Sequence, residues 1–315
     1  MLFGKCFMAR LSKTERWANT ILDGVKPIQG TLAETYLTKV RGISKISGKD
    51  LKFHPKVFVG KDENGKSINA PAMVAISRDS EGKAQGLQAT YLGKDGNKLD
   101  TNIKKRSLGK LSGNHVTLAG KKGSGMSFVA EGVETGLSVR EAIKDAHVIA
   151  TLGKHNIKNV DPKTLSDTVV LIADNDGKQL KDDKQIMDAA ARLSHAGKVV
   201  HVVMPESLGN KTDMNDILKQ KGTQGVLNTL ADRTIIIDQK TVGMPGRNNL
   251  AGFKRNNDTD IKSATKAYEQ NKMILMQDRS AQMDSMRSQA VQKDEITGPV
   301  PDRMIDRQIQ MEREL

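Results

Sequence analysis

The sequence predicts an α/β fold in which a parallel sheet flanked by helices follows a small α+β domain with a mainly antiparallel sheet. Two observations predict this order. Within residues 51–118, short apolar runs alternate with turn signals such as Glu63-Asn64-Gly65, which is typical of strands joined by hairpins. From residue 126 onward, apolar runs alternate with helical periodicity, which is typical of parallel strands joined by right-handed crossovers.

The first domain is expected to span residues 1–120. Residues 12–42 have apolar residues at helical spacing, and a break at 24–30, which contains Pro27, divides them into two segments. Strand-like pieces follow at 56–59, 72–77, 86–92 and 115–118. We therefore expect a helical entry and then antiparallel strands within 51–118.

The second domain is expected to span residues 124–238. Its predicted strands are 126–131, 147–152, 168–173 and 198–204, and its predicted helices are 135–144, a short one near 155–160, and 182–196. Residues 239–315 are polar and nearly free of aromatic residues, so they are expected to form a linker and a mostly disordered, flexible tail.

Composition favours a polyanionic partner. The chain carries 50 basic against 37 acidic residues, a net charge of +13, which suits nucleic acid. The single cysteine, Cys6, excludes an intramolecular disulfide and a cysteine-based zinc site, and it fits a reducing compartment. No apolar run is long enough to cross a membrane. We expect a cytoplasmic protein without a membrane partner.

Acidic residues follow two of the predicted strands. Glu131 comes at the end of the first apolar run, and Asp174 and Asp176 follow the third. Open α/β sheets place their chemistry outside the carboxyl ends of such strands. Carboxylates that meet there raise one another's pKa, and a hard divalent cation such as Mg²⁺ relieves this repulsion. Asp-x-Asp after a strand is also typical of a helix N-cap or a loop. The carboxylates together favour Mg²⁺-dependent chemistry on a nucleotide or a nucleic-acid backbone.

Three motifs follow one another at residues 128–138, 169–177 and 211–216. In this order they resemble the Toprim domain, in the version found in primases and relaxase-associated proteins of phages and conjugative plasmids. The preceding segment is similar to the domain that usually stands before this version, at residues 30–37, 51–55, 71–74 and 90–98. The resemblance implies a Toprim-like parallel sheet and a Mg²⁺ cofactor, with Mn²⁺ as an alternative.

The resemblance also implies roles for individual residues. It makes Glu131 the general acid/base or a metal ligand, and it makes Asp174 and Asp176 metal ligands. Asp216 matches a further acidic position near the metal, and Asp213 lies beside it. Glu134 stands at a predicted helix start, where an acidic side chain favours the helix dipole, so we expect it to support the site rather than to react.

Basic and glycine residues complete the predicted site. Gly132 allows backbone to approach substrate closely, and Lys178 and Lys211 are candidates for binding phosphate. A basic cluster that includes Lys104, Lys105 and Arg106 is read either as a nucleic-acid track or as a solvated face. Aromatic residues are 3% of the chain, so stacking-based reading of single-stranded bases is not supported.

A rival phosphate motif is present at residues 60–67, which satisfy the pattern G-x-x-x-x-G-K-S. A P-loop must lead into a helix, whereas Pro71 would interrupt a helix here after one turn. The segment is therefore interpreted as a hairpin turn. A topoisomerase is also disfavoured, because the chain lacks room for the domains that position its tyrosine nucleophile.

Three functions remain open. The first is a primase-like nucleotidyltransferase that acts on a DNA template in plasmid or phage replication or conjugation. The second is a Toprim nuclease, and the third is a non-catalytic DNA-binding carboxyl-terminal part of a conjugative relaxase. The expected partners are DNA in single-stranded form, nucleotides, and proteins of replication or conjugation.

Overall fold

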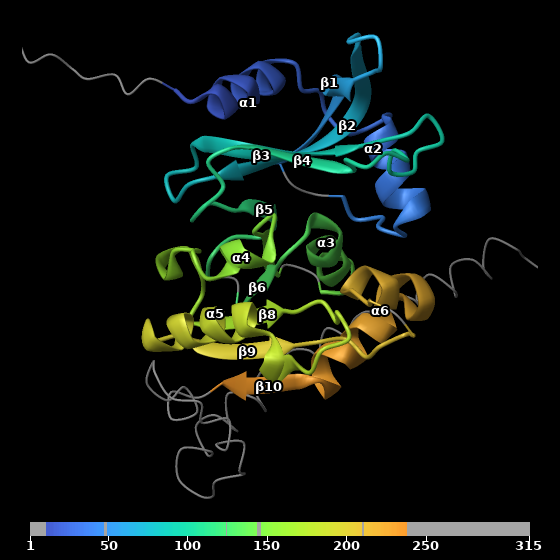
Figure 1. Cartoon of the computed structure of the whole chain (residues 1–315). Helices are drawn as coiled ribbons and strands as arrows, with labels where there is room; N and C mark the ends of the chain where they lie inside the picture. Colours follow the sequence, from blue (N-terminus) through green and yellow to red (C-terminus); the bar gives the residue numbers. More distant parts are fainter. Residues whose placement is uncertain (1–10, 47–48, 124, 144–145, 210, 238–315) are drawn as a thin grey trace, which may run out of the picture. The chain divides into compact units, whose positions relative to one another are not determined.

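The computed structural model describes residues 11–237 apart from 47–48, 124, 144–145 and 210 (Figure 1). All of these residues lie within one compact unit of the chain, Met1–Asn256. The predicted flexible tail, residues 239–315, lies outside the described residues.

The N-terminal helices begin with a capping box. The Ser12 side chain accepts the backbone N–H of Glu15, and the Glu15 carboxylate accepts the backbone N–H of Ser12, so two donors of the first turn are satisfied. Helix α1 (Lys13–Asp23) follows, and then a turn leads to α2 (Leu32–Thr35) and to one π-helical turn, η1 (Tyr36–Val40). Tyr36 and Leu37 of this turn are fully buried.

An antiparallel sheet of four strands follows, in the order β1-β2-β3-β4. The strands are β1 (Leu51–Lys61), β2 (Ser67–Arg78), β3 (Ala84–Tyr91) and β4 (Lys105–Gly109). Residue Ile21 of α1 packs into a core with apolar side chains of this sheet, among them Val57, Ala72 and Leu87. The predicted antiparallel character of this region is confirmed.

The segment at residues 60–67 is the hairpin turn between β1 and β2. Lys61 pairs with Ser67, and Gly65 adopts the left-handed conformation with φ +75°. The Asp62 carboxylate accepts the backbone N–H groups of Asn64 and Lys66, which fixes the turn internally. No helix follows it, so the P-loop interpretation is wrong and the hairpin interpretation is confirmed.

A second sheet of six strands has the order β10-β9-β8-β6-β7-β5. Its members are β5 (Val116–Ala119), β6 (Ser127–Ala130), β7 (His147–Ala150), β8 (Thr168–Ile172), β9 (Val199–Val203) and β10 (Thr234–Ile237). The four central strands run parallel, and the two edge strands pair antiparallel with β7 and β9. The predicted parallel sheet is thus confirmed.

The helices cover the two faces of this sheet. They are α3 (Val133–Ala142), α4 (Lys154–Ile157), α5 (Lys184–His195) and α6 (Met214–Asp232), with the 3₁₀ turns η2 (Pro162–Thr164) and η3 (Leu180–Asp182). Gly136 lets α3 lie close to the sheet, because a Cβ there would clash with Leu118 Cδ1 at 2.5 Å and would also touch Val148 and Ala130. Helix α5 packs instead with Val129 and Leu171. Since neighbouring strand residues point to opposite faces, α3 and α5 lie on opposite sides of the sheet.

The strand at 115–118 differs from the prediction, which placed it in the N-terminal sheet. His115 forms one bridge with Arg78 at the end of β2, and from Val116 onward the chain pairs with β7. Val116 and Leu118 are both fully buried, so this strand belongs to the edge of the second sheet. None of the helices in the described part of the chain is long and apolar enough to cross a bilayer.

Candidate active site

The topology of the second sheet indicates a ligand-binding site between the ends of β6 and β8. Strands β6 and β8 are neighbours, and Ala130 at the end of β6 pairs with Ile172 of β8. From this pair the chain crosses in opposite directions, through α3 to β7 and through α5 to β9. Such a switch point leaves a crevice beyond the carboxyl ends of the two strands, where open α/β folds bind their ligands.

Two predicted carboxylates stand at this switch point. Glu131 follows β6 directly, and Asp174 comes two residues after the end of β8. Burial and the neighbouring charges of Glu131 and Asp213 together raise the pKa of Asp174 to about 7, although the Lys154 charge acts in the opposite direction. The only hydrogen bond recorded for the Asp174 side chain in the described residues comes from Thr135 Oγ1, at 3.4 Å. The site thus holds negative charge with little local compensation.

Glu131 is half-buried, and its side chain makes no hydrogen bond or ion pair within the described residues. Gly132 next to it is the N-cap of α3, and no side chain caps this helix end. The first turn of α3 therefore presents its backbone N–H groups close to Glu131. This is the position at which the sequence predicted close backbone approach to substrate.

Asp176 has different surroundings from Asp174. Lys154 Nζ lies 2.8 Å from its Oδ2 atom, and Lys211 Nζ lies 3.4 Å from its Oδ1 atom. The Lys154 contact is the main reason that the pKa of Asp176 lies below its usual value. The two aspartates of one motif therefore differ, because Asp176 is neutralised by lysines and Asp174 is not.

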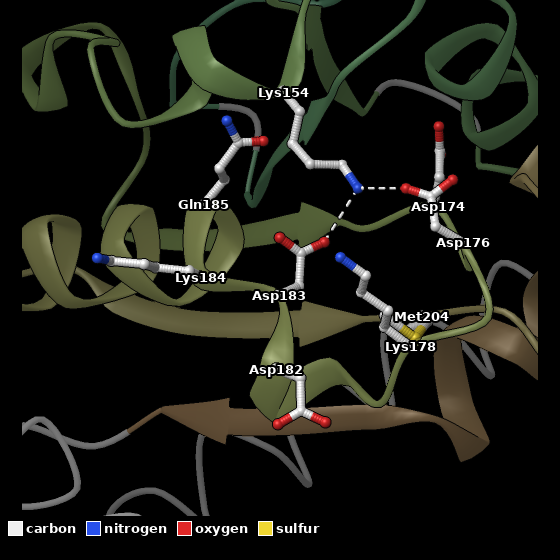
Figure 2. Close-up of a pocket in the computed structure, with 9 residues that line it drawn as sticks. All are labelled: Lys154, Asp174, Asp176, Lys178, Asp182, Asp183, Lys184, Gln185 and Met204. Atoms are coloured by element: carbon white, nitrogen blue, oxygen red, sulfur yellow. Dashed lines mark hydrogen bonds and ion pairs between the residues drawn. The ribbon is translucent and has the colours of Figure 1, made fainter. Parts of the chain in front are cut away.

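A pocket of about 260 Å³ lies at this end of the sheet, and Figure 2 shows the side chains that line it. Asp174 and Asp176 come from the loop after β8, and Asp183 is the N-cap of α5, where its side chain accepts the N–H of Ile186. Lys154 enters from the first residue of α4 and also contacts Asp183, with Nζ 3.0 Å from Oδ2. Lys178, a predicted phosphate-binding residue, lines the same pocket.

Sequence reasoning missed Lys154. Burial alone would lower the pKa of its ammonium, but hydrogen bonds to Asp176 and Asp183 outweigh burial and raise it. The available signal was its place after the second parallel strand, β7. Leu152, two residues earlier, is the one residue other than glycine with positive φ in the described chain, at +60°. Such strain is often found at functional sites.

Asp213 and Asp216 form the N-terminal cap of α6. The Asp213 side chain accepts the backbone N–H groups of Asn215 and Asp216, and Asp216 accepts the backbone N–H of Asp213. Burial and the charge of Asp216 raise the pKa of Asp213. Both side chains thus cap the start of α6. A role for Asp216 in metal binding stays a prediction.

Glu134 is buried and connects α3 to the antiparallel sheet. Tyr36 Oη donates to its Oε1 atom at 2.7 Å, Lys98 Nζ lies 2.9 Å from the same oxygen, and Lys105 Nζ lies 3.3 Å from Oε2. Burial alone would raise the pKa of Glu134, but Lys105, Lys98 and Tyr36 together hold it well below its usual value. Glu134 is therefore a buried anion three residues from Glu131.

The three predicted nucleic-acid contacts of the basic cluster have different surroundings. Lys104 is exposed, whereas Lys105 pairs with Glu134. Arg106 donates to Tyr91 Oη and to the Val59 carbonyl, and its guanidinium lies 5.1 Å from the centre of the Trp17 ring. Two of the three cations are thus engaged inside the protein, which the spacing of charges alone does not reveal.

The donor set at the switch point fits a hard divalent cation. Glu131 and Asp174 offer carboxylate oxygens, which are the ligands that Mg²⁺ prefers. The raised pKa of Asp174 is what such a cation would reverse. No group of three or more His, Cys, Asp or Glu side chains in the described residues is drawn together around a metal position. Both oxygens of Asp176 already contact lysines.

Comparison with known families and structures agrees with this architecture. Residues 126–224 match the family model described as the Toprim domain, and residues 12–118 match the one described as a domain of unknown function, DUF7146. The chain therefore carries a Toprim domain with the DUF7146 domain before it. No curated protein matches the chain significantly.

A solved primase shares the fold. The zinc-binding and RNA polymerase domains of the Aquifex aeolicus primase align with a TM-score of 0.50 at 17% identity, over 72% of this chain. This chain spans only 63% of the length of that one. A DNA primase domain from Pseudomonas aeruginosa aligns with a TM-score of 0.46 at 15% identity, over 71% of this chain and 79% of that chain. A primase catalytic domain bound to single-stranded DNA aligns at 0.48 and 14%, with the same coverage.

Proposed function

We propose that this protein is a Mg²⁺-dependent, primase-like nucleotidyltransferase that acts on a DNA template in plasmid or phage replication or conjugation. The observation that carries the proposal is the pair Glu131 and Asp174, which lie at the ends of neighbouring parallel strands and interact electrostatically. Their position within a Toprim domain, in a fold shared with a solved primase, supports a nucleotidyltransferase or a nuclease.

The residues present divide the chemistry between them. Asp174 and Glu131 would hold the divalent ion, with Asp176 next to them, and a bound ion supplies positive charge against the transferring phosphoryl group. The Glu131 side chain makes no hydrogen bond in the described chain, so its carboxylate is available either as a ligand of this ion or as the base that takes the proton of an attacking 3′-hydroxyl. Lys178, in the pocket, and the exposed Lys211 are placed to bind phosphate oxygens.

The proposed polyanionic partner is DNA. A net charge of +13 favours association with a phosphate backbone, and exposed Lys104 offers a direct contact. Lys105 and Arg106, by contrast, would act mainly through the protein contacts that they already make.

A primer-synthesis assay tests the proposal. Purified protein with single-stranded DNA, labelled ribonucleotides and Mg²⁺ or Mn²⁺ should give short oligomers. Glu131→Gln and Asp174→Ala should each reduce the yield at least about 100-fold, because each removes a group from the reacting centre. Asp167→Ala is the matched control. Asp167 precedes the same strand, β8, at its opposite end, and its side chain is fully exposed.

Two other results would select the competing functions. Metal-dependent nicking of DNA without oligomers, abolished by the same two substitutions, would replace the primase with a nuclease. Salt-sensitive DNA binding that Asp174→Ala leaves unchanged, without either activity, would favour a non-catalytic binding part of a relaxase.

A further inference from the structure

Lys154 is held between two carboxylates that come from different elements. Its Nζ atom lies 2.8 Å from Asp176 Oδ2 and 3.0 Å from Asp183 Oδ2, and its side chain is 14% exposed (Figure 2). Asp176 belongs to the loop after β8, and Asp183 begins α5. A single ammonium group therefore bridges these two elements inside the pocket.

The two carboxylates contribute differently to this bridge. Asp183 is fixed as a helix cap, because its Oδ1 atom accepts the N–H of Ile186 while Oδ2 faces Lys154. Within the described residues, the Asp176 side chain contacts ammonium groups alone, with Lys154 on one oxygen and the 82%-exposed Lys211 on the other. An ion that approached Asp176 would have to displace Lys154 or share its oxygen.

The backbone just before Lys154 has an unusual conformation. The residue two positions before Lys154 is Leu152, whose positive φ of +60° is unfavourable for a branched side chain. This turn, directly after β7, directs the chain into α4, which begins at Lys154. The side chain thus comes from the loop after β7, the strand next to β6, which precedes Glu131.

We propose that the Lys154 ammonium is a tethered cation that stands where a second divalent ion would otherwise bind, between Asp176 and Asp183. The acidic site then takes one divalent ion, at Glu131 and Asp174. In sites with two metal ions, both ions supply positive charge around the transferred group. Here the Lys154 ammonium supplies the positive charge that the second ion would otherwise supply. The inference rests on the proposed function only in requiring that the site bind a divalent ion.

A purely structural role for Lys154 predicts a different result. If the ammonium only ties the loop after β7 to α5, its removal should weaken the fold and leave metal binding as it was. If it stands in for an ion, its removal should create metal affinity that depends on Asp176. Counting bound ions separates the two roles without any measurement of activity.

The test is titration of the full-length protein with Mn²⁺, followed by electron paramagnetic resonance or calorimetry. Wild type should bind one ion. Lys154→Met should bind a second ion, or bind Mn²⁺ at least about tenfold more tightly, because the Oδ2 atoms of Asp176 and Asp183, no longer paired with Lys154, attract the cation. Adding Asp176→Asn to Lys154→Met should remove the gain, and Lys154→Arg, which keeps the charge, should bind one ion as wild type does.

Lys198→Met is the matched control. Lys198 is as buried as Lys154, with 11% of its side chain exposed, and it pairs with Asp167 far from the pocket. Its replacement should leave the ion count at one. Should Lys154→Met fail to fold, Lys154→Gln carries the same comparison with a polar side chain.

Each remaining outcome counts against the proposal. Two ions in wild type, or one ion with equal affinity in wild type and Lys154→Met, overturns the role of Lys154 and leaves the proposed function standing. Absence of Mn²⁺ binding in both proteins overturns this inference and the metal-dependent function together.

Discussion

At the scale of single residues, Asp174 and Asp176 show how one motif can hold two different carboxylates. Asp174 is largely buried beside Glu131, and its pKa is raised to about 7. Asp176 faces Lys154 and Lys211, and its pKa is lowered. The sequence predicted both as equivalent metal ligands. It could not separate them, because Lys154 precedes them by about twenty residues and reaches them only through the fold.

We expect Asp174→Asn to stabilise the metal-free protein. The folded pKa of this carboxyl, about 7, lies above its unfolded value of 3.8, so the destabilisation builds up as the pH rises between these two values, is complete above about pH 7 and disappears below about pH 4. At pH 8 the free energy of unfolding should rise by about 2 kcal/mol in urea denaturation. Added Mg²⁺ should stabilise wild type and not the variant.

Asp167→Asn is the control for this change, because the Asp167 side chain is fully exposed and its replacement should have almost no effect. An unchanged or lower stability of metal-free Asp174→Asn would show that Asp174 is not under electrostatic strain.

At the scale of elements, α3 connects the two sheets. It begins at Val133, just after Glu131, and its Glu134 contacts Tyr36, Lys98 and Lys105 of the N-terminal region. The sequence correctly placed Glu134 near a helix start, but it explained the residue by the helix dipole. Its partners lie about a hundred residues and about thirty residues earlier in the chain, so no local pattern reveals them.

We expect Glu134→Ala to lower the free energy of unfolding by about 3 kcal/mol, because it leaves Lys98 and Lys105 without their shared carboxylate at a largely buried position. Chemical denaturation at neutral pH measures this loss. Glu81→Ala, at an exposed turn, should change stability by less than about 0.5 kcal/mol. A loss as small as that for Glu134→Ala would mean that the buried pairs contribute little.

Three elements escaped the sequence prediction for identifiable reasons. Strand β4 begins with the polar residues Lys105-Arg106-Ser107. It lies at the edge of its sheet, where few side chains are buried, so its sequence shows little alternation of apolar and polar residues. Helix α6 is interrupted at Gly222, which has non-helical angles, and such a residue weakens helical periodicity. Strand β10 has four residues and pairs antiparallel, outside the strand–helix alternation.

At the scale of the whole molecule, three histidines are buried: His115, His147 and His201. Burial lowers the pKa of each, and for His147 the value falls to about 4, with the charge of His115 adding to the effect. His147 Nδ1 also lies 2.8 Å from Ser127 Oγ. These side chains are therefore neutral in the folded protein at pH 7.

Because Asp174 has the opposite pH dependence, the histidine effect is best measured in Asp174→Asn, whose free energy of unfolding we expect to fall as the pH drops from 7 to 5. Unfolded histidines take up protons near pH 6.5, whereas the folded ones resist protonation until well below it, so acid favours the unfolded state. His147 alone should account for about 2 kcal/mol of this fall. Urea denaturation at the two pH values measures it, and His147→Gln should reduce the dependence. A pH-independent stability over this range would contradict the burial of neutral histidines.

The sequence predicted more of the sheet than of the site. Apolar runs that alternate with helices indicate a parallel sheet wherever they occur, so β6 to β9 and the positions of Glu131 and Asp174 followed directly. The contacts made by Lys154, Glu134 and Asp213 depend on loop and helix-cap geometry, and they needed the folded chain.

The central claim is that Glu131 and Asp174 together bind the divalent ion of this site. Crystals of the protein soaked in Mn²⁺ and measured at the manganese absorption edge test it directly. The anomalous map should show one strong peak that contacts both carboxylates and none between Asp176 and Asp183. A peak confined to Asp176 and Asp183, or no peak within reach of Glu131 and Asp174, would contradict it.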